Sequence, residues 1–363
     1  MGIAQQSSPS EAMALEQQGK LAEAATAWRS IVSSNPKDAA AFASLGLVLS
    51  QQEQYAEAVP AYRRAIALNP KLRGVSLNLG LAEFKQGHFA AAIQPLTVAL
   101  AEDPANVQVH TLLGMSYYGT NKFTEAAKQL SIAVKAEPEN IELHRVLAQS
   151  CLSAKEYSCA SNEFRQILLK DPDSASAHVL SGEALDGLDR TPEAIEEFQA
   201  AAKASPQEPN VHFGLGYLYW KLLQFDNAKA AFEAELALDP NHAQALAYLG
   251  DVELKRGHAD KAYSLLAKAV ELRSDLRIAY LDLGEILAGR HQYQEAVTAL
   301  QRAIQLDPAE PDAHYWLGRV YEGTDKHEAA QAEFAKVRAL HQKAADNVAS
   351  TMSRLAAKQA TSQ

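Results

Sequence analysis

One alanine recurs every 34 residues along this chain, and this period limits the folds that the chain can adopt. It occupies ten successive positions with no insertion between them: Ala24, Ala58, Ala92, Ala126, Ala160, Ala194, Ala228, Ala262, Ala296 and Ala330. Eight of the fourteen prolines fall in a second column of the same period, which runs from Pro36 to Pro308. A fixed period of roughly 20 to 50 residues is typical of arrays built from one supersecondary unit. The sequence therefore predicts stacked repeats rather than a single central core.

The unit spanning residues 73–106 shows what is repeated. Apolar residues at helical spacing fill residues 75–84, and Gly87 then interrupts them, because glycine readily adopts the left-handed conformation that ends a helix. A second apolar series fills residues 89–100, and Pro104 follows it, because proline disfavours helix in the residue before it. Each unit is therefore predicted to be a helix–turn–helix.

Glycine marks a third column, which begins at Gly46, and large apolar residues mark a fourth, which runs from Trp28 to Phe334. The repeat length and these small, large and proline columns resemble those of the tetratricopeptide repeat family, and the resemblance covers residues 5–344. It implies an all-α, right-handed superhelical α-solenoid of about ten repeats. The array is expected over residues 10–344, with unit boundaries at 5–38, 39–72, 73–106, 107–140, 141–174, 175–208, 209–242, 243–276, 277–310 and 311–344. The pattern departs from the family where Ser274 and Gln342 replace proline and Glu235 replaces a small residue.

Both ends of the array depart from the repeat pattern. Residues 1–9 are expected to be a flexible N-terminus, with the first helix beginning near Ser10. Apolar residues continue at helical spacing after the last repeat, so residues 345–358 are expected to extend the last helix or to cap its apolar face. Residues 359–363 are expected to form a tail.

Histidine occupies the fourth position of five units: His110, His144, His178, His212 and His314. Neighbouring helix pairs stack about 10 Å apart, whereas zinc needs several ligands within about 2 Å of one ion. We therefore expect these histidines to pack between helices rather than to bind a metal. The sequence contains no nucleophile elbow, phosphate-binding loop or H-E-x-x-H motif. Accordingly, no catalytic residue, metal or cofactor is expected, and the chain is not expected to be an enzyme.

The net charge argues against nucleic acids and anionic membranes as partners. The net charge is -10, from 44 acidic and 34 basic residues, whereas nucleic acids and anionic membrane surfaces attract basic proteins. No apolar run is long enough to span a bilayer. The two cysteines, Cys151 and Cys159, match no zinc pattern. We expect them to be unpaired thiols, with a disulfide across one helical hairpin as the alternative.

The first residues bear on localisation. Gly2 follows the initiating methionine, but Gln6 stands where N-myristoylation requires Ser or Thr. The small residues of Gly2-Ile3-Ala4 resemble those that flank a signal-peptidase cut. A soluble, cytoplasmic protein is expected, and an exported or periplasmic protein is the alternative.

The family resemblance also implies which residues recognise a partner, because the first helix of each tetratricopeptide unit lines a concave groove. Two trios of groove positions step by four and three residues, so each trio shares a helix face: Leu77, Leu81 and Phe84, and Phe213, Tyr217 and Trp220. The complete set of expected peptide-binding residues is Leu77, Leu81, Phe84, Met115, Tyr118, Arg145, Glu183, Asp186, Phe213, Tyr217, Trp220, Lys221 and Asp251. The alternative is that some of these side chains pack against neighbouring helices.

Charge suggests which peptide the groove prefers. Glu183, Asp186 and Asp251 are expected to lie around the second trio, where a cation could meet aromatic faces and carboxylates. The hypothesis is a protein-interaction scaffold or adaptor that binds a peptide or protein segment carrying Arg or Lys, with the chain itself monomeric. The alternatives are an RNA-binding helical repeat, or a non-catalytic scaffold arm of a larger enzyme, secretion or assembly complex.

Overall fold

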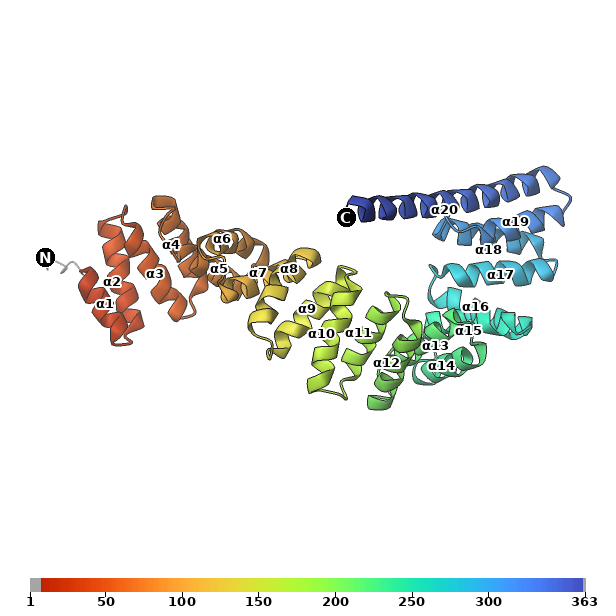
Figure 1. Ribbon diagram of the computed structural model, residues 1–363, viewed down its shortest axis with the longest axis horizontal. Coiled ribbons are helices and arrows are strands. Elements are labelled where there is room, and N and C mark those ends of the chain that lie inside the picture. The colour runs from red at the N-terminus through yellow and green to blue at the C-terminus, as the bar shows by residue number, and fades with distance from the viewer. Residues whose placement is uncertain (1–7, 362–363) are drawn as a thin grey trace. The chain divides into compact units, whose positions relative to one another are not determined.

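The computed structural model describes residues 8–361, and every regular element in that range is an α-helix. Figure 1 shows the helices joined in sequence by short turns, so that consecutive helices run in opposite directions. The all-α class predicted from the 34-residue period is confirmed. A bilayer-spanning helix is absent from the described residues, because none combines sufficient length with sufficient apolarity.

The helices belong to two compact units, residues 1–190 and 191–363, and the boundary in the sequence falls in the turn between α11 and α12. The first unit contains α1 (Pro9–Gln17), α2 (Leu21–Ser34), α3 (Ala39–Gln51), α4 (Tyr55–Leu68), α5 (Val75–Lys85), α6 (Phe89–Glu102), α7 (Val107–Gly119), α8 (Phe123–Ala136), α9 (Ile141–Ser153), α10 (Tyr157–Lys170) and α11 (Ala175–Asp186). The second contains α12 (Thr191–Ala204), α13 (Val211–Lys221), α14 (Phe225–Leu238), α15 (Ala243–Lys255), α16 (Ala259–Leu272), α17 (Arg277–Gly289), α18 (Tyr293–Leu306), α19 (Asp312–Glu322) and α20 (His327–Thr361).

Capping side chains begin several of these helices, and residues with a positive φ lie in the turns that follow the first helix of each hairpin. The side chains of Asp38, Asn106 and Asn140 each accept a hydrogen bond from the backbone N–H three residues later, which satisfies a donor that the first helical turn leaves free. At the turn inside each hairpin one residue has a positive φ: Gly19, Glu53, Gly87, Asn121, Lys155, Asp189, Leu223, Gly257, His291 and Asp325. This column has the 34-residue period, although only three of its members are glycine.

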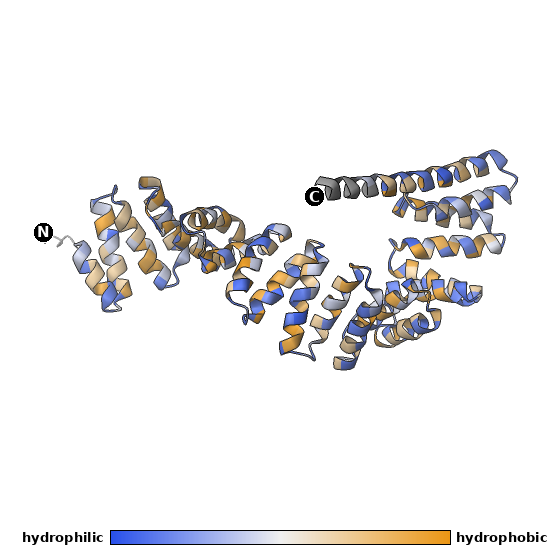
Figure 2. Cartoon of the chain, in the orientation of Figure 1, coloured by the Kyte–Doolittle hydropathy of each residue, from blue (hydrophilic) through white to orange (hydrophobic). Residues whose placement is uncertain are grey.

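The hairpins pack through the small and large columns of the repeat. Ala92 is fully buried, and Leu96 one turn later is equally buried. A Cβ atom added to Gly80 would lie 2.6 Å from Leu96, so the first helix can approach the second only because residue 80 lacks a side chain. Figure 2 shows apolar and polar residues sharing each helix, as expected where one stripe is buried and the other is solvated.

Four of the five histidines in the column contact the carbonyl oxygen of the proline in the linker before their hairpin. The Nε2 atom of His110 lies 3.0 Å from the carbonyl oxygen of Pro104, and its Nδ1 atom lies 2.8 Å from Gln129 Oε1. His144 makes the equivalent contacts with Pro138 and Glu163. These side chains therefore hold the proline linker against the second helix, which is the packing role that the sequence predicts for them.

The expectation that the two cysteines are unpaired thiols is wrong. Cys151 and Cys159 form a disulfide, with their Cα atoms 5.8 Å apart, instead of remaining as thiols. Cys151 lies in the last turn of α9 and Cys159 in the first turn of α10, and the tight turn between the two helices brings these ends together. Eight residues of sequence thus become a short distance in space, within the range that a disulfide requires.

The ends of the chain differ in detail from the sequence expectations. The first helix begins at Pro9, one residue earlier than expected, because Ser8 caps it by accepting a hydrogen bond from the N–H of Glu11. The helix of the last repeat continues without a break to Thr361, and Val348 on this extension is 62% exposed. Residues 1–7, including Gly2-Ile3-Ala4, and residues 362–363 lie outside the described part of the chain.

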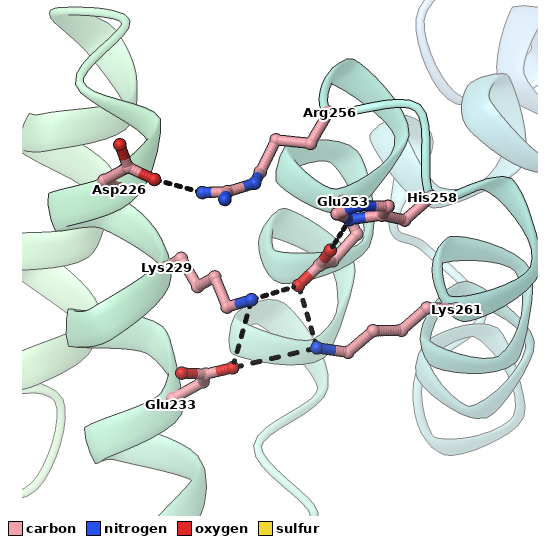
Figure 3. A network of polar contacts seen from close by, with 7 residues as sticks. All are labelled: Asp226, Lys229, Glu233, Glu253, Arg256, His258 and Lys261. Carbon is pink, nitrogen blue, oxygen red and sulfur yellow. Dashed lines mark hydrogen bonds and ion pairs between the residues drawn. The ribbon is translucent and has the colours of Figure 1, made fainter.

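A network of charges joins α14, α15 and α16 in the second unit (Figure 3). Its centre is Glu253, whose side chain is fully buried and accepts hydrogen bonds from Lys261 at 2.8 Å and His258 at 2.6 Å. Lys229 reaches the same carboxylate at 2.9 Å, and Glu233 lies on the outer side of both lysines. The first unit has a similar arrangement, in which buried Glu83 contacts Arg63 and His88.

Candidate functional site

The second unit contains a pocket of about 520 Å³ formed by the first helices of four successive hairpins. These are the helices that the family resemblance assigns to the concave side. The pocket is lined by Trp220, Gln244, Tyr248, Asp251, Lys255, Asp275, Leu276, Arg277, Ile278, Leu281, Asp282, Glu285, Asp312 and Trp316. Aromatic rings, acidic side chains and aliphatic residues therefore meet in one hollow.

Trp220 forms one wall of the pocket in a fixed orientation. Its indole Nε1 donates a 2.6 Å hydrogen bond to Asp251 Oδ2, and its ring stacks on Tyr217 and meets Tyr248 edge-on at 5.0 Å. The two hydrogen-bond partners are 31 residues apart, so a side chain of α15 orients a side chain of α13 in the hairpin before it. The first unit uses the same spacing, because Tyr118 donates a 3.0 Å hydrogen bond to Gln149.

Two acidic side chains of the pocket, Asp251 and Asp282, are buried. Asp251 and Asp282 are only 3% and 1% exposed. Asp282 Oδ2 and Arg277 Nε are buried atoms without a hydrogen-bond partner in the described part of the chain, and both residues line the pocket. A buried acceptor left unpaired costs about 1–3 kcal/mol. An incoming donor could therefore recover free energy at Asp282.

Burial shapes the acid–base chemistry of the pocket. It raises the pKa of Asp282 well above its ordinary value, and the nearby Asp251 raises it further through its charge and a hydrogen bond. Burial also raises the pKa of Glu285, although the positive charge of Lys255 opposes that shift. The cause in both cases is that a low-dielectric site disfavours the charged form of a carboxyl group.

The charges of the pocket do not balance. Five acidic residues line it, and two basic residues, Lys255 and Arg277, stand against them. Lys255 Nζ lies 3.7 Å from Asp251 Oδ1, and Arg277 forms an ion pair with Asp312 at the rim. The excess of acidic groups makes the pocket attractive to a cation, and its aromatic walls favour a cation that tolerates partial dehydration.

The structure brings together only part of the residue set expected from sequence. Trp220 and Asp251 line the pocket, and Tyr217 supports Trp220 from behind its ring. Phe213 instead packs against Phe232 and Tyr248, and its backbone N–H donates a 3.0 Å hydrogen bond to the buried Glu235. Lys221 is exposed at the end of α13.

The remaining expected residues lie in the first unit. Leu77, Leu81 and Phe84 are half-buried against a cluster that includes Leu96 and Leu113, and Met115 and Tyr118 pack against the next cluster along the chain. Arg145 is exposed and lies 3.6 Å from Glu142. Glu183 and Asp186 also belong to this unit, so their expected place beside the trio of the second unit stays a prediction.

Among the pocket residues that sequence reasoning missed are Tyr248, Asp282 and Trp316. All three occupy the sixth position of their repeats, which was not counted among the groove-lining positions. A signal was present, since Asp282 is the only charged side chain at that position from the second repeat to the tenth: Ser44, Asn78, Leu112, Val146, Leu180, Gly214, Tyr248, Asp282 and Trp316.

Family models match most of the chain. A model described as tetratricopeptide repeat matches residues 10–73, 44–107, 157–209 and 213–276, and so covers more than half of the sequence. A second model of that description matches residues 83–150, and a model described as TPR repeat matches residues 290–325. No curated protein matches the sequence.

Solved structures share the fold. The APC/C hetero-tetramer Cut9-Hcn1 is similar at 15% identity and a TM-score of 0.53, over 91% of this chain and 79% of that one. Pseudomonas aeruginosa PilF is similar at 17% identity and a TM-score of 0.50, over 57% and 94%. YrrB, described as a TPR protein with an unusual peptide-binding site, has 22% identity and a TM-score of 0.41, over 49% and 91%. At these identities the similarities to Cut9-Hcn1 and PilF show the fold alone.

Proposed function

We propose that this chain, which belongs to the tetratricopeptide repeat family, is a protein-interaction scaffold whose second unit binds a segment of another protein. The segment carries a cationic side chain, Arg or Lys, that enters the pocket formed by α13, α15, α17 and α19. The observation that carries this proposal is Asp282, a buried acid with an unpaired oxygen in a pocket lined by more acids than bases.

The aromatic residues of the pocket support binding of a peptide that carries a cationic side chain. Binding energy in protein interfaces concentrates at a few buried aromatic and charged anchors, and Trp220, Tyr248 and Trp316 are aromatic anchors of this kind. Trp220 is held in place before binding by its hydrogen bond to Asp251, so little conformational entropy is lost when a ligand packs on it. The function proposed is therefore binding without catalysis.

Peptide selection tests the proposal even though the partner is unidentified. A randomised library of capped dodecapeptides is selected on the wild-type chain and on Trp220→Ala, and the affinities of the enriched peptides are then measured. Enrichment of Arg or Lys at one anchor position is expected, with affinity reduced tenfold or more in the variant, which corresponds to about 1.4 kcal/mol.

A matched control separates the pocket from general surface charge. Glu271 is an exposed acid on α16 outside the pocket lining, so Glu271→Gln should bind the selected peptides like the wild type. Circular dichroism checks that each variant keeps its helices. Selection of the same peptides by the wild type and Trp220→Ala at equal affinity would contradict the proposal.

A further inference from the structure

The acids of the pocket are arranged as a pair that holds a proton. Asp251 and Asp282 are almost fully buried and line the same pocket. Burial, and then the charge of Asp251 and a hydrogen bond with it, raise the pKa of Asp282 well above its ordinary value. Two neighbouring carboxylates repel each other strongly in a buried site, and a hydrogen bond between two carboxyl groups requires that one of them carries a proton. One proton is therefore shared by the pair when the pocket is empty of a ligand.

The other charged groups around this pair come from each helix that packs on it. Lys255 lies on α15 beside Asp251, and Tyr248 on the same helix stays neutral because burial, with the neighbouring Tyr217 and Asp251, raises its pKa to about 12. The α17 and α19 sides contribute the remaining charges: Asp275, Arg277, Glu285 and Asp312. Asp275 and Asp312 are already paired with Arg273 and Arg277. Glu285 is therefore the acid near the pair without a strong ion pair in the described residues.

The acceptors and the walls together define the cation that fits. Asp282 and Glu285 contribute carboxyl groups to the pocket lining, of which Asp282 Oδ2 is buried and unpaired in the described residues, and Trp220 and Trp316 contribute aromatic rings. A guanidinium is planar, has five N–H donors, stacks on aromatic rings and is weakly hydrated, whereas an ammonium is a compact and strongly hydrated charge. The pocket therefore matches the shape and the donors of a guanidinium.

We infer that the pocket selects the guanidinium of arginine over the ammonium of lysine, and that binding expels the proton shared by Asp251 and Asp282. The proton passes from the carboxyl pair to solvent, the guanidinium keeps its charge, and no covalent bond changes. This inference rests on the proposed function, because it names the side chain that the bound segment would insert.

The three tryptophans of the chain provide a direct readout. Trp220 and Trp316 line the pocket, whereas Trp28 lies in the first unit, where its indole donates to Glu16. The indole N–H signals of the ¹⁵N-labelled full chain, assigned with single Trp→Phe variants, are followed while capped Gly-Arg-Gly is added. Capped Gly-Lys-Gly, capped Gly-citrulline-Gly and free arginine are titrated in parallel.

The expected result is a shift of the Trp220 and Trp316 signals with Gly-Arg-Gly, at a dissociation constant at least tenfold lower than with Gly-Lys-Gly or the citrulline peptide. The Trp28 signal should not move. Equal binding of the lysine and arginine peptides would overturn guanidinium selection and leave the proposed function intact. A citrulline peptide that binds as tightly as the arginine peptide, or no shift with any probe, would overturn both.

Free arginine separates the two possible sources of a guanidinium. Weaker binding of free arginine than of Gly-Arg-Gly supports a protein segment as the ligand. Equal or tighter binding would leave guanidinium selection intact and overturn the proposal that the pocket receives a segment of a protein.

Proton release is measured by calorimetry at matched pH between 5 and 8, at each pH in two buffers that are effective there and differ in ionisation enthalpy. Binding of Gly-Arg-Gly should release protons at the lower end of this range, and its affinity should rise with pH to a plateau. Asp282→Asn, which resembles the protonated side chain in shape, should bind at least tenfold more weakly without proton release, whereas Glu271→Gln should behave like the wild type. Binding without proton release across the whole range, or an unchanged Asp282→Asn variant, would overturn the shared-proton part of the inference.

Discussion

The buried carboxylate of Glu253 stabilises the second unit, and replacing Glu253 should destabilise α15 and α16. Burial raises the pKa of Glu253, but hydrogen bonds from Lys261, Lys229 and His258 outweigh that effect and lower it from 4.5 to about 2. The shift of about 2.5 units corresponds to about 3 kcal/mol at roughly 1.4 kcal/mol per unit. The side chains of Lys261 and His258 are 49% and 55% exposed, so solvent screening reduces the expected contribution to about 1–2 kcal/mol.

The sign of the pH dependence follows from the lowered pKa. Stability from Glu253 is fully present above the unfolded-state pKa near 4.5 and is lost as the pH falls toward the folded value of about 2. Glu253→Gln should therefore be less stable than the wild type by about 1–2 kcal/mol at pH 6. The difference should shrink between pH 4.5 and pH 2.

Hydrogen exchange measures this effect locally. Amides of α15 and α16 should exchange about 5 to 30 times faster in Glu253→Gln at pH 6, because 1–2 kcal/mol is a factor of that size. The matched control is Glu233→Gln, since Glu233 is 48% exposed and contacts the same two lysines at 3.8 to 3.9 Å. Its effect should stay below about 0.5 kcal/mol. Equal exchange in Glu253→Gln and the wild type would refute the reasoning.

Four further substitutions test the turns, the disulfide and the packing of the repeats. Leu223 has a φ of 57° and is 71% exposed. Leu223→Gly should therefore raise the free energy of unfolding, measured by urea titration, by about 1 kcal/mol, whereas Gly257→Leu in the same column should lower it. Loss of the Cys151–Cys159 disulfide in the Cys159→Ala variant should cost about 2–3 kcal/mol for a loop of this length, and the wild type should resist alkylation until it is reduced. Ala228 is fully buried, so Ala228→Leu should lower the thermal midpoint by overpacking that costs about 1–3 kcal/mol, and an unchanged midpoint would contradict the packing account.

The repeat fold could be predicted because its determinants recur at one period. Ala92 belongs to a column that is alanine in all ten hairpins, and Gly80 to a column that is glycine in eight of them, so many copies report the same steric requirement. The left-handed turn was predicted only at Gly87, because its column also contains residues as different as Glu53 and Leu223. The requirement at that position lies in the backbone, and many side chains tolerate it at a modest cost.

The candidate pocket could be predicted only in part, because it is made by departures from the repeat. Trp220 and Asp251 were found through the family's groove positions, but their 2.6 Å hydrogen bond depends on how one hairpin stacks on the next. Asp282 was missed because its column is mostly uncharged, and its burial follows from the side chains of the neighbouring helices. The pairing of Cys151 with Cys159 likewise depends on the geometry of one turn.

Site-specific photocrosslinking in cells tests the central claim most directly. A photoreactive amino acid replaces Leu281, which lines the pocket, and in a separate protein it replaces Leu272, which is 44% exposed and outside the pocket lining. The account predicts a discrete crosslinked protein from position 281 and not from position 272, with the crosslink within a few residues of an arginine or lysine. Identical crosslinking from both positions, or a crosslinked segment at position 281 without a basic residue nearby, would contradict it.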